Sequence, residues 1–166
     1  MSELRELHSK VPCGRGFLGA ALIVVALWPA GAAAQAQGTC TVNRATYHVG
    51  ANCASTSSTT FVNIPQALVD VTVGGTAPTC VIAVFSTQTQ TTADENMLVR
   101  ARIAGIGIAD PADTGLGAGI GSVEARSAQF VFEDVPPGDY TVRMQYRSVP
   151  GTTVTICEPT LVVHHR

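Results

Sequence analysis

The stretch YTVRMQYR, residues 140–147, alternates without a break between large apolar or aromatic side chains and polar ones. A period of two residues is that of a β-strand with one buried face, because successive side chains point to opposite sides of a sheet. The predicted inner face consists of Tyr140, Val142, Met144 and Tyr146. Turn-forming residues lie on both sides of the stretch, DVPPGD before it and VPGT after it, so it predicts a complete strand between two turns.

The same pattern recurs through the chain after residue 60. Short runs of β-forming residues are separated by Gly, Pro, Thr and Ser roughly every ten residues, and none shows the 3.6-residue period of a helix. The further predicted strands are 69–73, 79–86, 97–104, 128–133 and a last strand over 154–157 and 161–164, bent at Pro159. Residues 80–85, CVIAVF, are apolar on both faces, which predicts a central strand covered on both sides. The pattern predicts a single antiparallel β-sandwich of about seven or eight strands.

Two segments are predicted as loops. Residues 88–96 are polar, and residues 105–122 contain six glycines. Each glycine inside a helix costs about 1 kcal/mol, so we expect residues 105–122 to form a long flexible loop with at most a poor edge strand.

The N-terminal 36 residues have the three parts of a secretory signal peptide. Basic residues are followed by an apolar run over 17–28 and then by small residues, GAAAQAQ. The run is 28 − 17 + 1 = 12 residues long, whereas a membrane-spanning helix needs roughly 20. We expect cleavage after Ala36, with Ala34 as the alternative. The predicted domains are a signal peptide over 1–36 and a β-sandwich over 37–166, in a protein that is secreted or periplasmic and of bacterial origin.

Four cysteines remain after residue 36, and an even number in an exported domain predicts disulfides. Three pairings are possible. The preferred pairing is Cys40 with Cys53 and Cys80 with Cys157. No C-x-x-C spacing suggests a metal site.

The stretch VPPGDYTVR, Val135 to Arg143, resembles the connection between strands E and F of immunoglobulin-like and fibronectin-III-like sandwiches. It is equally similar to the corresponding turn of transthyretin-like modules. The resemblance implies that Tyr140, after Gly138, forms a tyrosine corner, with its ring in the core and its hydroxyl bonded to the backbone upstream. It implies a fold and no activity, and a jelly roll is the alternative sandwich.

No nucleophile–base set is apparent in the sequence. After residue 36 the histidines are His48, His164 and His165, none within a recognisable motif, and there is no G-x-S-x-G. The last two end the sequence, where we expect fraying.

Two pairs of acidic residues are considered as a catalytic or a calcium-binding site. Asp94 and Glu95 are interpreted as solvated loop acids rather than a glycosidase pair. Asp110 and Asp113 are interpreted as turn residues, although they have oxygens that calcium accepts. The glycine-rich segment matches neither phosphate-binding pattern, so no catalytic, metal or cofactor site is predicted.

The net charge of the part after residue 36 limits the kinds of binding partner that we expect. The part after residue 36 has seven arginines, no lysine and ten acidic residues, a balance of 7 − 10 = −3. Because the sequence shows no basic stripe, nucleic acid and membrane surfaces are not expected as partners. The predicted function is that of a non-enzymatic exported module that binds a protein or glycan, or is structural. The alternatives are a small hydrolase or accessory domain of an enzyme, and an inhibitor or carrier that acts through residues 105–122.

Overall fold

The computed structural model describes residues 40–92, 97–119, 121–150 and 152–166, which belong to one compact unit spanning residues 37–166. The predicted signal peptide lies outside the described residues. The described residues form strands and connections and contain no helix. None of them forms a helix long and apolar enough to cross a membrane.

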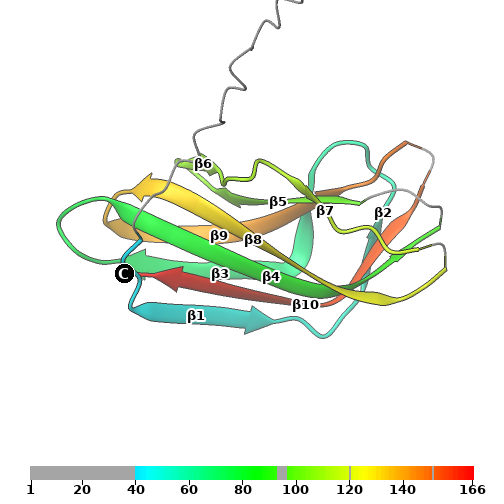
Figure 1. The fold of residues 1–166 in the computed structure, drawn as a ribbon, viewed down its shortest axis with the longest axis horizontal. Coiled ribbons are helices and arrows are strands. Elements are labelled where there is room, and N and C mark those ends of the chain that lie inside the picture. Colours follow the sequence, from blue (N-terminus) through cyan, green and yellow to red (C-terminus); the bar gives the residue numbers. More distant parts are fainter. Residues whose placement is uncertain (1–39, 93–96, 120, 151) are drawn as a thin grey trace, which may run out of the picture. The chain divides into compact units, whose positions relative to one another are not determined.

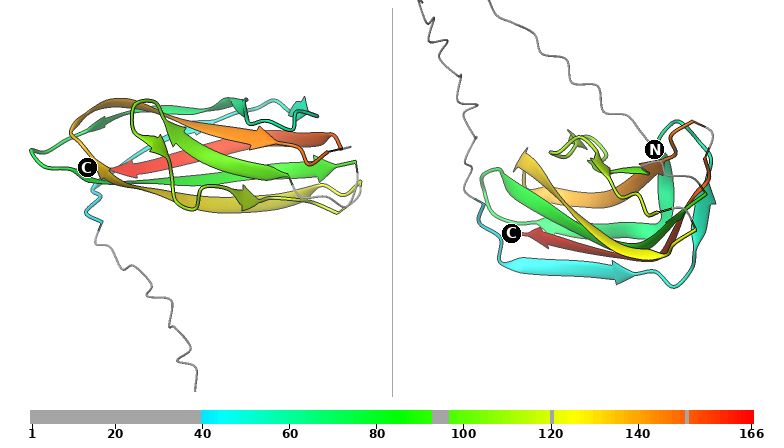
Figure 2. Two further views of the ribbon diagram at one scale, coloured as in Figure 1. Left: turned by 90° about the horizontal axis from the view of Figure 1, so that it is seen from above. Right: turned by 45° about the vertical axis from the view of Figure 1, so that its right-hand side comes forward.

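Two antiparallel sheets form the domain (Figures 1 and 2). Sheet A has the order β1-β10-β4-β8, with β2 also paired to β10. Its strands are β1 (Arg44–Val49), β2 (Ala54–Thr56), β4 (Thr79–Thr91), β8 (Glu124–Val135) and β10 (Val154–His165). Sheet B has the order β3-β9-β5-β6, with β7 also paired to β5. Its strands are β3 (Val62–Val73), β5 (Leu98–Ile103), β6 (Gly107–Ile108), β7 (Thr114–Gly115) and β9 (Gly138–Arg147). The predicted all-β, antiparallel sandwich is confirmed.

The strand order is that of a jelly roll. Strands pair as in one long hairpin, β1 with β10, β3 with β9, β4 with β8 and β5 with β6. Rolling up this hairpin adds the pairs β10 with β4 and β9 with β5. In an immunoglobulin-like sandwich the first two strands are hydrogen-bonded neighbours in one sheet. Here β1 and β2 both pair with β10 and not with each other, and the next strand, β3, lies in the other sheet. The jelly roll, which was the alternative prediction from the sequence, is therefore the observed topology, and the prediction of an immunoglobulin-like strand order was wrong.

The core lies between the inner faces of the two sheets. Phe85 and Phe130 from sheet A meet Met97 and Met144 from the other side, and all four side chains are fully buried. The predicted inner face of β9 is confirmed, because Val142, Met144 and Tyr146 are buried and Tyr140 packs against the same cluster. Alternation in the sequence thus placed this strand correctly.

The disulfide pairing differs from the preferred one. Cys40 pairs with Cys80, and Cys53 pairs with Cys157. The correction follows from topology: β1 pairs along β10, so the segment after β1 meets β10 at Cys157, and the segment before β1 reaches the start of β4 at Cys80. Both bonds fasten the N-terminal part of the domain to sheet A.

Several strand predictions need correction. β1, β2 and the first half of β3 were not predicted, and residues 88–91 belong to β4 rather than to a loop. β4 is central, but only its inner face is buried, since Ile82 and Val84 on its outer face are half-buried. His164 and His165 do not fray: they end β10, which lies between β1 and β4, and the side chain of His165 is buried against Thr46. The bend in this strand is confirmed as a register shift between Cys157 and Thr160.

Tyr140 has the contacts expected of a tyrosine corner. Its hydroxyl donates to the carbonyl oxygen of Pro136 at 3.0 Å. A Cβ atom at Gly138 would lie 3.3 Å from that hydroxyl oxygen, so glycine allows the ring to lie close to the turn. The local geometry implied by the VPPGDYTVR stretch is therefore present within a jelly roll.

Candidate functional site

Four arginines gather on the outer face of sheet B. Arg100 and Arg102 come from β5, and Arg143 and Arg147 come from β9. They alternate with core residues on both strands, so all four side chains point away from the core. We call this surface the arginine face, and it also includes Phe61, Asn63 and Gln145. The left panel of Figure 2 views the molecule from the side of β5 and β9. These four of the seven arginines after residue 36 form no stripe in the sequence and come together only in the fold.

The register of the sheet brings like charges together. Arg102 lies directly opposite Arg143, and Arg100 lies opposite Gln145. Directly opposed residues have Cβ atoms roughly 4.5–5.5 Å apart, and opposed like charges destabilise a sheet. The pair Arg102–Arg143 is therefore an unfavourable arrangement in the absence of an anion.

Gln145 organises the centre of this face. It is buried, at 7% exposure, although it points outward. Its amide nitrogen donates to Asn63 Oδ1 at 2.9 Å, and its oxygen Oε1 accepts from Arg100 Nε at 2.8 Å. The amide thus links three strands in one row, from β3 through β9 to β5, and holds Arg100 by one of its five N–H donors.

Phe61 lies beside two guanidinium groups. The Cζ atom of Arg100 is 4.0 Å from the ring centroid, and that of Arg147 is 5.2 Å away. Both distances are within the range of a cation–π interaction. Arg100 is therefore positioned by two independent contacts, the ring and the Gln145 amide.

The arginines lack acidic partners among the described residues. In that part of the chain the one ion pair joins Arg126 and Glu124. Burial, with repulsion from Arg102 and Arg147, lowers the pKa of Arg100, while Asp113 acts in the opposite direction. An arginine remains charged in a protein despite such a shift, so the face holds a concentrated positive charge on a domain whose net charge is negative.

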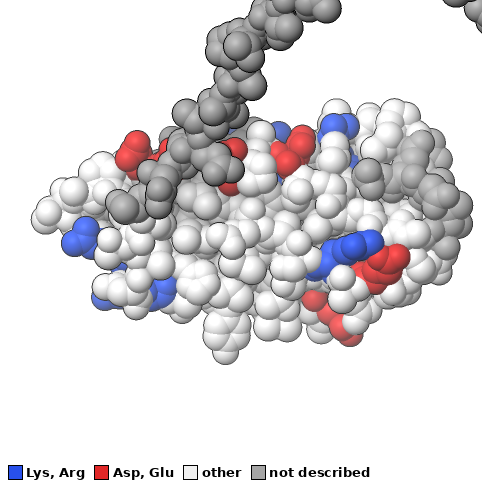
Figure 3. Space-filling model, in the orientation of Figure 1, with Lys and Arg blue, Asp and Glu red and all other residues white. Residues whose placement is uncertain are grey.

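The outer face of sheet A is different. Its three central rows of side chains hold no arginine, lysine, aspartate or glutamate. By register they are Ala45, His164, Ile82 and Val131; Tyr47, Val162, Val84 and Gln129; and Val49, Thr160, Ser86 and Ser127. Figure 3 shows the broad middle of this face without charge. Tyr47 lies on this face, and its exposed fraction is 70%. The two faces of the sandwich thus differ sharply in charge.

A shallow pocket of about 300 Å³ lies on sheet B, beside the arginine face. Thr72 donates to Asp139 and Thr141 donates to Asp70, each across the β3–β9 pair. Both carboxylates are already hydrogen-bonded within the sheet. They lie at the far end of β9 from Arg147 and bound the arginine face with negative charge.

Those acids and histidines considered in the sequence that the structure describes are not brought into one site. Asp94 and Glu95 lie outside the described residues. Asp110 forms a two-way backbone bridge to Val131 at 2.8 Å, while His48 is exposed on β1. Among the described residues, no three His, Cys, Asp or Glu side chains gather closely enough to hold a metal ion.

The glycine-rich segment is attached to the core. Ala109, Leu116 and Ala118 within residues 105–122 are buried, and the segment contains β6 and β7. The poor edge strand expected in this segment is present as the two short strands β6 and β7, and the prediction of a loop is corrected in one respect, because buried side chains anchor the segment to the core. Of its glycines, Gly107 lies in β6 and Gly115 in β7, while Gly105 and Gly121 have positive φ angles outside the strands.

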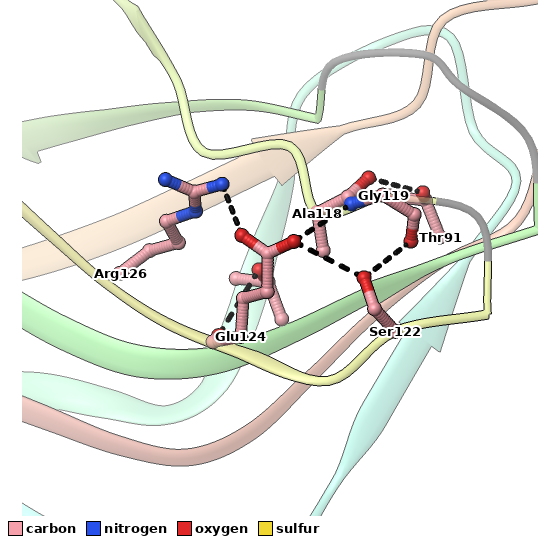
Figure 4. Close-up of polar contacts among 7 residues, drawn as sticks. Thr91, Ala118, Gly119, Ser122, Glu124 and Arg126 are labelled. Atoms are coloured by element: carbon pink, nitrogen blue, oxygen red, sulfur yellow. Dashed lines mark hydrogen bonds and ion pairs between the residues drawn. The ribbon is translucent and has the colours of Figure 1, made fainter.

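Figure 4 shows how the end of this segment is held. Thr91 Oγ1 donates to the Ala118 carbonyl at 2.9 Å. Glu124 accepts from the Gly119 amide and from the Ser122 hydroxyl, both at 3.1 Å, and pairs with Arg126. These hydrogen bonds lower the pKa of Glu124, the Gly119 amide first. The network joins β4, β8 and the glycine-rich segment.

Comparisons with known proteins identify no family. No family model matches the chain, and no curated protein matches it. Among solved structures, infectious bursal disease virus of the Gx strain matches with 13% identity over 75% of this chain and 34% of the viral chain, at a TM-score of 0.35. The Gt strain of the same virus matches with 11% identity over 93% of this chain and 40% of the viral chain, at a TM-score of 0.36. The chain thus spans less than half the length of these viral chains, and the similarity is too low to bear on function.

Proposed function

We propose that this protein is an exported, non-enzymatic binding module that holds an anionic partner on the arginine face. The observation that carries the proposal is the directly opposed pair Arg102–Arg143 on the same face as Arg100 and Arg147, which both lie near the ring of Phe61. Among the described residues, no acidic side chain forms an ion pair with these four arginines. The four cations repel one another, which costs stability, and a bound anion would relieve this repulsion.

The scaffold supports a binding role. Sites on strands are positioned more precisely than sites on loops, and all four arginines come from two adjacent strands of a packed sandwich. Hydrogen bonding by Gln145 and stacking on Phe61 orient Arg100 before a ligand arrives. Such preorganisation lowers the entropic cost of binding.

Export is supported by two lines of reasoning. Two disulfides are typical of proteins in an oxidising compartment. The signal-like sequence over 1–36 would direct the chain there. Mass measurement of the protein from the culture supernatant or periplasm tests this step, and a chain that keeps residues 1–36 would contradict it.

Binding is tested by chromatography on carboxymethyl-dextran against unmodified dextran. We expect retention on the charged matrix only, with elution by salt because exposed charges are screened. Arg102→Gln/Arg143→Gln should elute at lower salt than the unaltered protein. Arg44→Gln/Arg166→Gln removes the same net charge elsewhere and should elute with the unaltered protein. Equal behaviour of the two variants would contradict the assignment of the arginine face.

A further inference from the structure

We infer that the partner of the arginine face is an acidic polysaccharide whose carboxylates are held by arginine forks. This inference rests on the binding role proposed above and names its ligand class. It depends on four features of the arginine face. These are the opposed pair Arg102–Arg143, the fixed orientation of Arg100, the spacing of the arginines along the strands, and the contact of Phe61 with a guanidinium group.

Arg102 and Arg143 form a clasp for one carboxylate. Both side chains are exposed, and neither has a hydrogen-bond or ion-pair partner among the described residues. A guanidinium donates two parallel N–H groups to the two oxygens of a carboxylate, a planar match that a lysine ammonium does not offer. A carboxylate between the two forks would receive donors from both sides and cancel their mutual repulsion.

Arg100 provides a second position with a fixed orientation. Its Nε donates to Gln145 and its Cζ lies over Phe61, which leaves the terminal nitrogens available for a ligand. Asn63 accepts the Gln145 amide through Oδ1. Asn63 is an exposed residue, and its amide nitrogen has no hydrogen-bond partner among the described residues, so this nitrogen can donate to a sugar hydroxyl.

The charges form a line along the strands. Arg100 and Arg102 are two residues apart on β5, which corresponds to roughly 6.6–6.8 Å along a strand. Arg143 and Arg147 are four residues apart on β9, roughly 13 Å. An extended chain with repeated carboxylates can contact several of these arginines at once, whereas a single small anion can use one position.

The same face is poorly suited to nucleic acid. Proteins that bind single strands stack bases on open aromatic faces, but Phe61 already lies against the guanidinium of Arg100 at 4.0 Å. The net charge of −3 after residue 36 and the acids Asp70, Asp139 and Asp113 near the patch oppose a long, densely charged phosphate chain. A polysaccharide with one carboxylate per sugar has a lower charge density and many hydroxyls.

The test is calorimetric titration of the purified protein with polygalacturonate, using fully methyl-esterified polygalacturonate as the control with the same backbone and no charge. We expect binding to polygalacturonate and at least about a tenfold loss with the ester, because hydrogen bonds to charged groups are lost. Arg102→Gln/Arg143→Gln should lose about tenfold, and Arg44→Gln/Arg166→Gln should stay within about twofold. Near-ultraviolet circular dichroism of each variant confirms that it is folded.

Titrations with two further polymers, dextran sulfate and oligo-dT, distinguish a failure of this inference from a failure of the proposed function. If dextran sulfate or oligo-dT binds as tightly as polygalacturonate and depends on the same arginines, the arginine face is an anion site but the polysaccharide inference is wrong. If no polyanion binds, both proposals are wrong. If polygalacturonate binds equally to the unaltered protein and to Arg102→Gln/Arg143→Gln, the site lies elsewhere and both are overturned.

Discussion

At the scale of single residues, Gln145 illustrates that the alternation of polar and apolar residues predicts the side of the strand on which a residue lies but not its contacts. The pattern in residues 140–147 places Gln145 on the outer side of a strand, and the structure confirms this side. Its burial and its hydrogen bonds to Asn63 and Arg100 depend on which strands lie next to β9. Strand neighbours are set by topology, so one-dimensional spacing cannot predict the network that orients Arg100.

The Tyr140 corner gives a prediction about stability. Tyr140→Phe removes the hydroxyl that donates to the Pro136 carbonyl and should lower the free energy of unfolding by about 0.5–1.5 kcal/mol. Tyr146→Phe is the matched control, because the Tyr146 hydroxyl has no hydrogen-bond partner in the described part of the chain, and burial raises its pKa. We expect a change close to zero for the control. Urea denaturation followed by circular dichroism measures both, and equal losses would contradict the corner's contribution.

Glu124 gives a prediction about pH. Its pKa is lowered in the folded protein by the Gly119 amide and the Ser122 hydroxyl. A lowered carboxyl pKa contributes stability that is present above the unfolded-state pKa and is lost as pH falls through the folded-state pKa. Glu124→Gln should therefore be less stable than the unaltered protein at pH 7, with a difference that shrinks as the medium becomes acidic. Thermal melts from pH 7 to pH 3 check this, and a difference that is constant over the range would contradict it.

At the scale of elements, the sequence identifies strands with a strict alternation or a strong apolar run. β9 and the core half of β4 are of this kind, whereas β1 was missed because nearly all of its side chains are exposed and its residues do not alternate clearly. The polar end of β4, residues 88–91, looked like a loop because threonines rather than aliphatic residues occupy its buried positions. The glycines of residues 105–122 concealed the buried Ala109, Leu116 and Ala118.

The pairing of β5 with β9 predicts that Arg143, a residue of the proposed binding site, lowers the stability of the folded protein. Arg143→Gln removes the like charge opposite Arg102 and should raise the free energy of unfolding by about 0.2–1 kcal/mol at low ionic strength. The gain should decrease in 1 M NaCl, where charges a few ångströms apart are screened. Chemical denaturation by urea at two salt concentrations measures it. A loss of stability at low salt would show that the Arg102–Arg143 pair is not repulsive in the folded protein.

At the scale of the whole molecule, the pattern of short strands and turns predicted a sandwich and the cysteine count predicted two disulfides, and neither could specify the order of strands. The jelly-roll pairing of β1 with β10 joins residues that are 111 to 121 positions apart in the sequence, and that of β3 with β9 joins residues that are 65 to 84 positions apart. Such contacts leave no local signal, and the preferred disulfides were wrong for the same reason. The arginine face was missed because its members come from two separate strands whose adjacency is a property of the fold.

The disulfides give a prediction for the whole domain. Cys53–Cys157 closes 104 residues and Cys40–Cys80 closes 40. The loop-entropy model assigns these closures about 4.7 and about 3.9 kcal/mol. Cys53→Ser/Cys157→Ser should therefore be destabilised at least as much as Cys40→Ser/Cys80→Ser. Peptide mass mapping without reduction checks the connectivity first, and a Cys40–Cys53 peptide would contradict it.

Side-chain NMR of labelled arginine shows whether the ligand binds on the arginine face. On titration with short polygalacturonate chains, we expect the Nε–Hε resonances of Arg102 and Arg143 to shift together with that of Arg100, while those of Arg44 and Arg126 do not move. Resonances of Tyr47 on the uncharged face should also remain in place. Shifts confined to Tyr47 and its neighbours, or no shift in any arginine, would show that the arginine face does not bind the ligand.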